Sequence, residues 1–171
     1  VAPDGAANDR FGRSVGIDDD TLVVGAHGDD DNGIDSGSVH LFVRNGNAWT
    51  HHAKLVAPDG VAYEYFGFSV GIFGDTVVIG AYGDDDNGPY SGSAYLFVLN
   101  NDAWTYQTKL WAPDGAAGHH FGVSVAVFGD TVVVGSSAGD DDKGTDSGTA
   151  YVFALINDTW THQAKLVAPD G

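Results

Sequence analysis

The sequence contains no cysteine and few basic residues, and both absences exclude whole classes of function. Without cysteine, neither a disulfide nor a thiolate metal site is possible. Lysine and arginine together number 7 against 24 aspartates and glutamates, which leaves a formal net charge of -17 at pH 7. Nucleic acid and anionic membrane surfaces repel so acidic a chain, and we expect neither as a partner. The charge suits a bound cation, a basic partner or a solvated acidic surface.

Long hydrophobic runs are also missing. No stretch approaches the roughly 18 consecutive apolar residues of a membrane helix, so we expect no insertion into a membrane. No segment has helical spacing of apolar residues over a useful length. Apolar residues still make up 43% of the 171 residues, which is enough for one ordinary domain with a packed core.

An internal repeat of about 55 residues organises the chain. The dipeptide Phe-Gly occurs three times at intervals of 55 residues, at Phe11, Phe66 and Phe121. Repeats of this length are typical of solenoids, propellers and arrays. We therefore expect a single repeat-built segment over residues 1–171. Its repeats cover approximately 6–60, 61–115 and 116–171.

Each repeat contains four short runs rich in β-branched and aromatic residues, with turn residues between them. The runs of the three repeats are 11–17, 21–26, 38–43 and 48–56; 66–73, 76–81, 93–98 and 103–111; and 121–128, 131–136, 149–154 and 159–167. Four antiparallel strands repeated in this way predict an all-β fold of three four-stranded β-propeller blades. Closure of a propeller usually takes four to eight blades, so we expect another chain, or further blades of a longer array, to close the ring.

An acidic loop bounded by glycine separates the second and third runs of every repeat, at 28–37, 83–92 and 139–148. Calcium is bound by six to eight oxygens from carboxylates and carbonyls, and closely spaced like charges are costly without a counter-ion. We therefore expect calcium in at least one loop. The candidate ligands are Asp29, Asp31, Asp35, Asp84, Asp86, Asp140, Asp142 and Asp146. The alternative is a solvated acidic turn whose side chains cap nearby backbone amides.

The acidic loops are expected to share one end of the blades with the connections between repeats, because alternate connections of an antiparallel meander emerge on the same side. Aromatic and imidazole side chains occur in the same segments. We expect a ligand face there, formed by Tyr63, Tyr65, Tyr82, Tyr90, His119 and His120. In the alternative arrangement, Tyr63 and Tyr65 pack beneath the loops. Lysine recurs before leucine in the fourth run, and its expected role is either a structural ion pair or an aliphatic stem packed between blades with the ammonium group in water.

Three segments of the second repeat, taken in order, carry a family resemblance. They are Phe66-Gly67-Phe68-Ser69-Val70, Val77-Val78-Ile79-Gly80-Ala81 and Gly92-Ser93-Ala94-Tyr95-Leu96-Phe97. This order resembles the FG-GAP repeat of integrin alpha subunits, in the bacterial and marine form with long acidic loops. The resemblance implies an extracellular β-propeller for adhesion or ligand recognition, commonly with calcium and without catalytic activity. It also implies a calcium loop between the first two strands, but the turns there are too short to surround an ion.

The resulting functional hypothesis is a non-enzymatic extracellular adhesion or ligand-recognition module at the cell surface or in secreted form. Its expected cofactor is calcium in the acidic loops, and its expected ligand is a protein or a glycan. Two alternatives stay open: a structural subunit that assembles between chains into rings or fibres, and a calcium-dependent lectin. An enzyme is not expected, because no set of acid, base and nucleophile recurs in the repeats.

Overall fold

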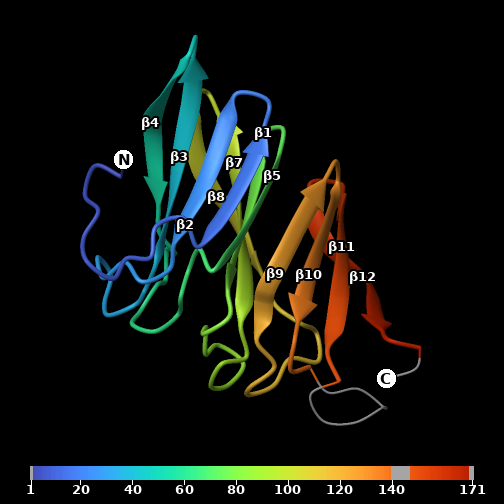
Figure 1. Ribbon diagram of the computed structural model, residues 1–171. Helices are drawn as coiled ribbons and strands as arrows, with labels where there is room; N and C mark the ends of the chain where they lie inside the picture. Colours follow the sequence, from blue (N-terminus) through green and yellow to red (C-terminus); the bar gives the residue numbers. More distant parts are fainter. Residues whose placement is uncertain (1, 140–146, 170–171) are drawn as a thin grey trace.

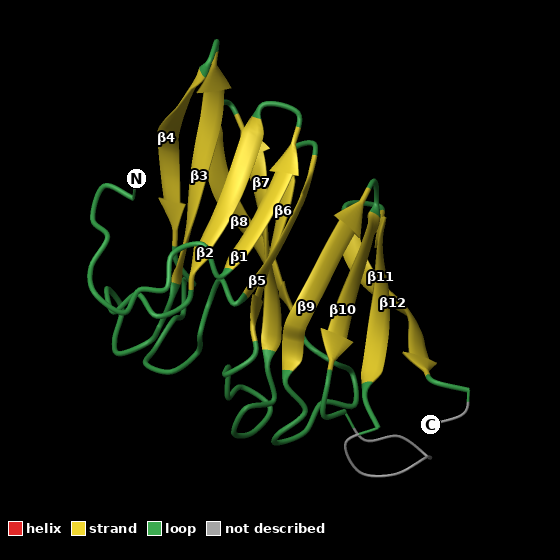
Figure 2. Cartoon of the chain, viewed as in Figure 1, coloured by secondary structure: helices red, strands yellow, loops and turns green. Residues whose placement is uncertain are grey.

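The protein, as a computed structural model, is described over residues 2–139 and 147–169. In these ranges it forms twelve β-strands and no helix (Figure 2). The first sheet consists of β1 (Ser14–Asp18), β2 (Thr21–Ala26), β3 (Ser38–Asn45) and β4 (Ala48–Leu55). The second consists of β5 (Ser69–Phe73), β6 (Thr76–Ala81), β7 (Ser93–Asn100) and β8 (Ala103–Leu110). The third consists of β9 (Phe121–Phe128), β10 (Thr131–Ser136), β11 (Thr149–Ile156) and β12 (Thr159–Val167). The described part of the chain offers no helix of the length and hydropathy needed to span a membrane.

Each sheet is an antiparallel meander in which the strands pair in chain order (Figure 1). A register shift interrupts the pairing of the third and fourth strands in every sheet. Such bulges increase the local twist, which suits a propeller blade. The expected all-β fold of three four-stranded antiparallel blades is confirmed. We call the three sheets blades 1, 2 and 3.

Two hydrophobic cores lie between the blades, one on each side of blade 2. The first core contains Phe66, Val77 and Ile79, and the second contains Val78 and Phe121. All five side chains are fully buried. Because successive side chains of a strand point to opposite faces, the unbroken apolar run of β6 serves both cores. The middle blade is therefore buried on both faces, whereas blades 1 and 3 each have one covered face.

Two of the expected strand starts are wrong. The first strands of blades 1 and 2 begin at Ser14 and Ser69, three residues after the expected Phe11 and Phe66. Phe66 forms an isolated parallel bridge to Gly37 of blade 1 and lies ahead of the β5 ladder. In blade 3 the equivalent Phe121 bridges Gly92 and also begins β9, where it pairs with Ser136 beyond a register shift. The Phe-Gly segments of blades 2 and 3 therefore join each blade to the preceding one.

The acidic loop of one blade holds the Phe-Gly segment of the next blade through the backbone. Between blades 1 and 2, the N–H groups of Tyr65 and Phe66 donate to the carbonyls of Asp35 and Ser36 at 3.1 and 3.0 Å. The equivalent bonds between blades 2 and 3, both 3.0 Å, run from His120 to Tyr90 and from Phe121 to Ser91. Both described acidic loops thus connect consecutive blades.

Candidate functional site

Aspartate side chains shape the acidic loops by accepting hydrogen bonds from the loops themselves. In blade 1, Asp29 accepts from the Asp31 N–H at 3.0 Å and from the Ser38 hydroxyl at 2.9 Å. In blade 2, Asp84 makes the same two bonds, with the Asp86 N–H at 3.1 Å and the Ser93 hydroxyl at 3.0 Å. These contacts match the capping role that was the alternative to calcium binding.

A lysine ammonium lies among the carboxylates of each described loop. In blade 2, Lys109 Nζ forms ion pairs with Asp84, with Asp86 at 2.6 Å and with Asp59 at 3.0 Å. The side chains of Lys109 and Asp84 are 7% and 1% exposed, so this pair is buried. The Tyr95 hydroxyl, 2.8 Å from Asp59 Oδ1, completes the cluster. The lysine before leucine in the fourth strand therefore has the expected structural ion pairs.

The same arrangement recurs in blade 1 and, as far as it is described, in blade 3. Lys54 Nζ lies 2.6 Å from Asp4, 2.8 Å from Asp29 and 2.6 Å from Asp31. Lys165 pairs with Asp114 at 2.7 Å. Each lysine thus links the acidic loop, or the preceding Ala-Pro-Asp-Gly connection, to the fourth strand of its blade.

The pKa values of these groups reflect the competition between burial and pairing. Burial on its own lowers the pKa of Lys109, but hydrogen bonds to Asp84 and Asp86 outweigh it and raise the pKa overall. Burial raises the pKa of Asp29, but the hydrogen bonds from Lys54, the Asp31 N–H and the Ser38 hydroxyl, with the positive charge of Lys54, together outweigh it and lower the pKa overall. Lysine and aspartate are therefore both held in their charged forms at neutral pH.

The predicted metal ligands divide into three groups. Asp29, Asp31, Asp84 and Asp86 surround the lysines, as described above. The carboxylate of Asp35 belongs to no described ion pair, and its N–H donates to Asp30 Oδ1 at 2.8 Å. Asp140, Asp142 and Asp146 lie outside the described residues. Within residues 2–139 and 147–169, no three acidic or imidazole side chains are placed to share a metal ion. Calcium binding in these loops stays a prediction.

An aromatic cluster gathers four of the six residues expected on the ligand face. The rings of Tyr65 and Tyr82 are stacked, with centroids 5.0 Å apart and an interplanar angle of 5°. His120 meets Tyr82 edge-on at 5.6 Å and Tyr90 at 6.1 Å. The cluster crosses the junction between blades 2 and 3, so residues from both repeats form it.

The other two expected residues have different positions. Tyr63 is 48% exposed, and its N–H donates to the Ile34 carbonyl at 2.7 Å. His119 is 9% exposed, and its Nδ1 accepts from the Ala116 N–H at 3.3 Å. The tyrosine is therefore available to a ligand, whereas the histidine caps its own turn.

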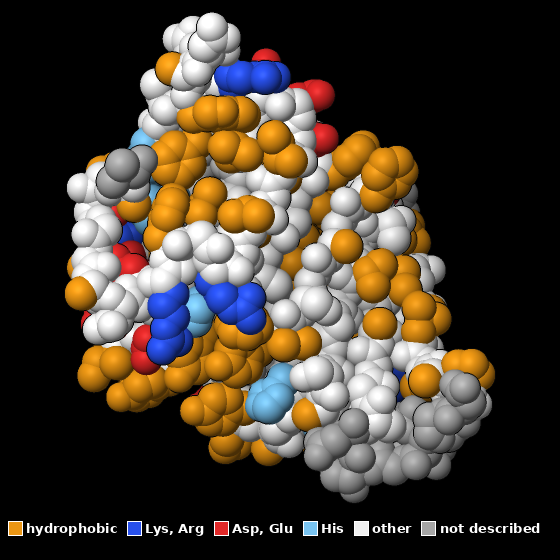
Figure 3. Space-filling view, viewed as in Figure 1, with side chains coloured by type: hydrophobic (Ala, Val, Ile, Leu, Met, Phe, Trp, Pro, Cys, Tyr) orange, Lys and Arg blue, Asp and Glu red, His pale blue; other side chains and the backbone are white. Residues whose placement is uncertain are grey.

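Two arginines extend the aromatic cluster toward blade 1. The Arg13 guanidinium lies 4.3 Å from the centroid of the Phe68 ring. Arg10 lies 3.1 Å from His27 Nε2, and the His27 ring contacts both Tyr65 and Phe68. Figure 3 shows lysine or arginine side chains beside histidine and hydrophobic side chains at the loop end of the first sheet. Neither Arg10 nor Arg13 forms an ion pair with a described carboxylate, unlike the other four described cationic side chains.

The backbone holds this surface in a fixed shape. Arg10, Tyr65 and His120 occupy the same position in the three repeats, and their φ angles are 55°, 58° and 56°. Residues other than glycine adopt positive φ at a cost, and such conformations persist where the surrounding structure determines them. We call the set of Arg10, Arg13, Tyr65, Phe68, Tyr82, Tyr90 and His120 the aromatic–arginine surface. His27, which is 3% exposed, is buried against Tyr65 and Phe68 of this surface.

Comparison with known proteins identifies the family of this repeat. The model of the FG-GAP repeat family matches residues 1–42, 49–97 and 104–153, which together make up most of the chain. The chain belongs to the FG-GAP repeat family. No curated protein matches the sequence.

Two solved structures resemble the FG-GAP chain. The crystal structure of Saccharomyces cerevisiae Sqt1 has a TM-score of 0.57 and 10% identity, and the match covers 95% of this chain and 37% of Sqt1. The structure of YjhT has a TM-score of 0.46 and 16% identity, and the match covers 91% of this chain and 51% of YjhT. The FG-GAP chain therefore spans between a third and about half of the chains it resembles, and the likeness to Sqt1 shows the fold alone.

The sequence analysis did not predict two residues of the candidate site, Arg10 and His27. Arg10 and His27 were not selected because they are isolated in sequence. Superposition of the repeats puts Arg10 in register with Tyr65 and His120, and it puts His27 in register with Tyr82. A comparison of the repeats position by position would therefore have identified both residues.

Buried charge marks one further group. Glu64 is 6% exposed and its Oε2 atom is buried without a hydrogen-bond partner. Burial, and then the nearby negative charge of Asp84, raise the pKa of Glu64 to about 7. Burial, and then the positive charges of Arg10 and Arg13, lower the pKa of His27 to about 4. The folded protein therefore favours the uncharged form of both side chains. The raised pKa of Glu64 contributes stability that is lost as pH rises, and the lowered pKa of His27 contributes stability that is lost as pH falls.

Proposed function

We propose that this FG-GAP chain is a non-enzymatic ligand-recognition and adhesion module that acts outside the cell. Its ligand would bind at the aromatic–arginine surface. One observation carries the proposal: the stacked Tyr65 and Tyr82 rings lie in a continuous array with Arg10 and Arg13, whose charges no described carboxylate neutralises. In a chain with a net charge of -17, two such adjacent arginines are exceptional. Loops at one end of a rigid β scaffold are also where binding residues concentrate.

The chemistry of this surface suits a glycan with a single carboxylate or sulfate group. Arginine binds such groups through paired hydrogen bonds, and tyrosine offers a rigid apolar ring with a polar end. Tyr63 and Tyr90 are 48% and 41% exposed and supply additional aromatic area at the edge. A highly charged polyanion fits less well, since the remaining negative charge of the protein repels it.

A glycan array with neutral, singly anionic and polyanionic members tests the proposal. We expect retention of singly anionic glycans, and a loss of about tenfold or more in affinity for Arg13→Gln and Tyr82→Ala. Arg44→Gln is the matched control, because it removes the same charge from an exposed pair with Asp20 at the far end of blade 1. Silence of the array, or equal binding by Arg13→Gln and Arg44→Gln, would overturn the proposed ligand class. Binding of an acidic protein instead of a glycan would overturn it as well.

The acidic loops have a separate role in this proposal. We propose that lysine supplies the counter-charge in the loops of blades 1 and 2, where the sequence suggests calcium. The supporting contacts are the ion pairs of Lys54 and Lys109, each with three aspartates. A calcium ion in either loop would have to displace an ammonium group from its carboxylates. The loops would therefore stabilise the junctions that hold the ligand surface in shape.

A further inference from the structure

The uncovered face of blade 1 carries apolar residues that are buried or partly buried at the equivalent positions of the other blades. Phe11, Val15 and Ile17 are 42%, 67% and 63% exposed. Figure 3 shows hydrophobic side chains gathered over this face. The residues at these positions in blades 2 and 3 belong to the two cores or pack against them: Phe66, Val70, Ile72, Phe121, Val125 and Val127. Blade 1 thus exposes the face that, in blades 2 and 3, packs against the preceding blade.

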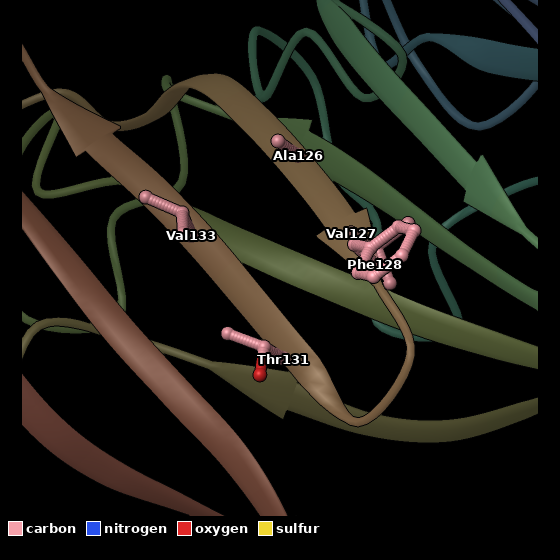
Figure 4. A pocket seen from close by; sticks show the side chains of 5 residues that line it. All are labelled: Ala126, Val127, Phe128, Thr131 and Val133. Atoms are coloured by element: carbon pink, nitrogen blue, oxygen red, sulfur yellow. The ribbon is translucent and has the colours of Figure 1, made fainter.

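The uncovered face of blade 3 contains a groove of about 310 Å³. Ala126, Val127, Phe128, Thr131 and Val133 line it, and Figure 4 shows them on the neighbouring strands β9 and β10. The position of Val133 in the repeat shows that this face would meet a following blade. The equivalent valines of blades 1 and 2, Val23 and Val78, lie in the cores shared with the following blade. The groove therefore opens where a following blade would be placed.

Internal geometry shows which side chain the groove receives. A Cβ atom added to Gly16 would lie 3.3 Å from Ile72 Cγ2, and one added to Gly71 would lie 3.5 Å from the Val127 N atom. The first strand of each following blade thus crosses its neighbour at this position. Ala126 is the equivalent residue of blade 3. The residue of blade 1 in register with Ile72 and Val127 is Ile17.

We propose that the groove of blade 3 is the docking site for Ile17 of a second copy of this chain, in a head-to-tail arrangement. The contact would continue the two interfaces already present within the chain, with the same positions of the repeat on both sides. Three blades fall short of the four to eight that close a propeller, whereas two copies supply six. A head-to-tail contact made twice closes a two-fold ring and leaves no sheet face uncovered.

Sedimentation velocity of the 171-residue chain over a range of concentrations tests this assembly. We expect a species with the mass of two chains. Ile17→Asp and Val133→Asp each bury a carboxylate in the contact without a partner, and each raises the dissociation constant by about a hundredfold or more. Ile156→Asp is the control, because Ile156 is 46% exposed and occupies the position of Asn45 and Asn100 in the other repeats. It should assemble as the unmodified chain does.

A mixing experiment distinguishes head-to-tail contact from pairing of two identical faces. An equimolar mixture of Ile17→Asp and Val133→Asp still has one unaltered pair of faces, so we expect a one-to-one dimer that opens at its other contact. The proposal is overturned if the unmodified chain is monomeric. A monomer is the result expected when only further blades of a longer chain cover these faces. Species heavier than two chains would contradict the closure of the ring by two copies. Dimers that persist in either single variant overturn the assignment of the groove.

Discussion

Replacement of Lys109 by methionine is the sharpest perturbation of the acidic loop of blade 2. Methionine keeps the length and apolar stem of the side chain but removes the ammonium group that pairs with Asp59, Asp84 and Asp86. Asp84 would then be a carboxylate with 1% side-chain exposure and no cation beside it. The loss of stability comes mainly from this stranded charge rather than from the lost attraction.

The magnitude follows from the burial of each partner. Breaking a buried ion pair by removing one member costs about 3–5 kcal/mol. The side chains of Asp59 and Asp86 are 53% and 62% exposed, so water replaces much of what they lose. We therefore place the expected loss of unfolding free energy for Lys109→Met at the low end, about 3 kcal/mol.

Urea unfolding at one fixed protein concentration measures this loss. Arg44→Met is the control, because the Arg44–Asp20 pair has side chains that are 49% and 62% exposed and should contribute about 1 kcal/mol or less. A loss no greater than that of Arg44→Met at neutral pH would refute the assignment of Lys109 as the buried counter-ion.

The remaining predictions concern buried titrating groups and a close backbone contact. Glu64 has a folded-state pKa of about 7 against an ordinary value of 4.5, so the folded state binds its proton more tightly and stability falls as pH rises between these values. Glu64→Gln should abolish that fall in urea unfolding at pH 5 and pH 8, and an unchanged fall would contradict the raised pKa. His27 has a folded-state pKa of about 4 against 6.5, so stability should fall as pH drops through that window, and acid titration of His27→Tyr should show a smaller fall. Gly67→Ala should cost about 3 kcal/mol or more, since its φ is 86° and a Cβ would overlap the Ser38 carbonyl. Gly12 has a φ of 90° but open space around it, so Gly12→Ala should lower the free energy of unfolding by only about 1 kcal/mol, measured by thermal unfolding. Equal losses in the two variants would show that the backbone conformation, and not the overlap with Ser38, determines the cost.

The repeat made most of the fold predictable from sequence. A period of 55 residues fixed the number of blades, and the β-branched runs located the strands, including the doubly buried β6. In blade 2 the Phe-Gly segment lies ahead of β5 and its backbone bonds run to blade 1, and local sequence pattern carries no signal for such a contact. Gly37, the bridge partner of Phe66, is 29 residues away in the chain.

The candidate site was only partly predictable, for a related reason. Charge density in the loops suggested a cation, and the recurrence of lysine before leucine suggested an ion pair, but nothing in the sequence joined the two. Lys109 follows Asp86 by 23 residues, and the turn of the β7–β8 hairpin brings them together. Tyr65 and Tyr82 were selected because topology places their segments beside the acidic loops. Arg10 and Arg13 belong to no motif and stand out only when the repeats are compared position by position or the blades are seen next to one another.

Calcium titration of the unmodified chain and of Lys109→Met, run in parallel by calorimetry, tests the role of the lysines most directly. If the ammonium group occupies the place of a cation in the loop of blade 2, its removal should open that place, and Lys109→Met should bind one more calcium ion than the unmodified chain. The comparison counts sites by difference, so binding elsewhere in the chain does not affect it. The same number of calcium ions bound by both proteins would contradict the account.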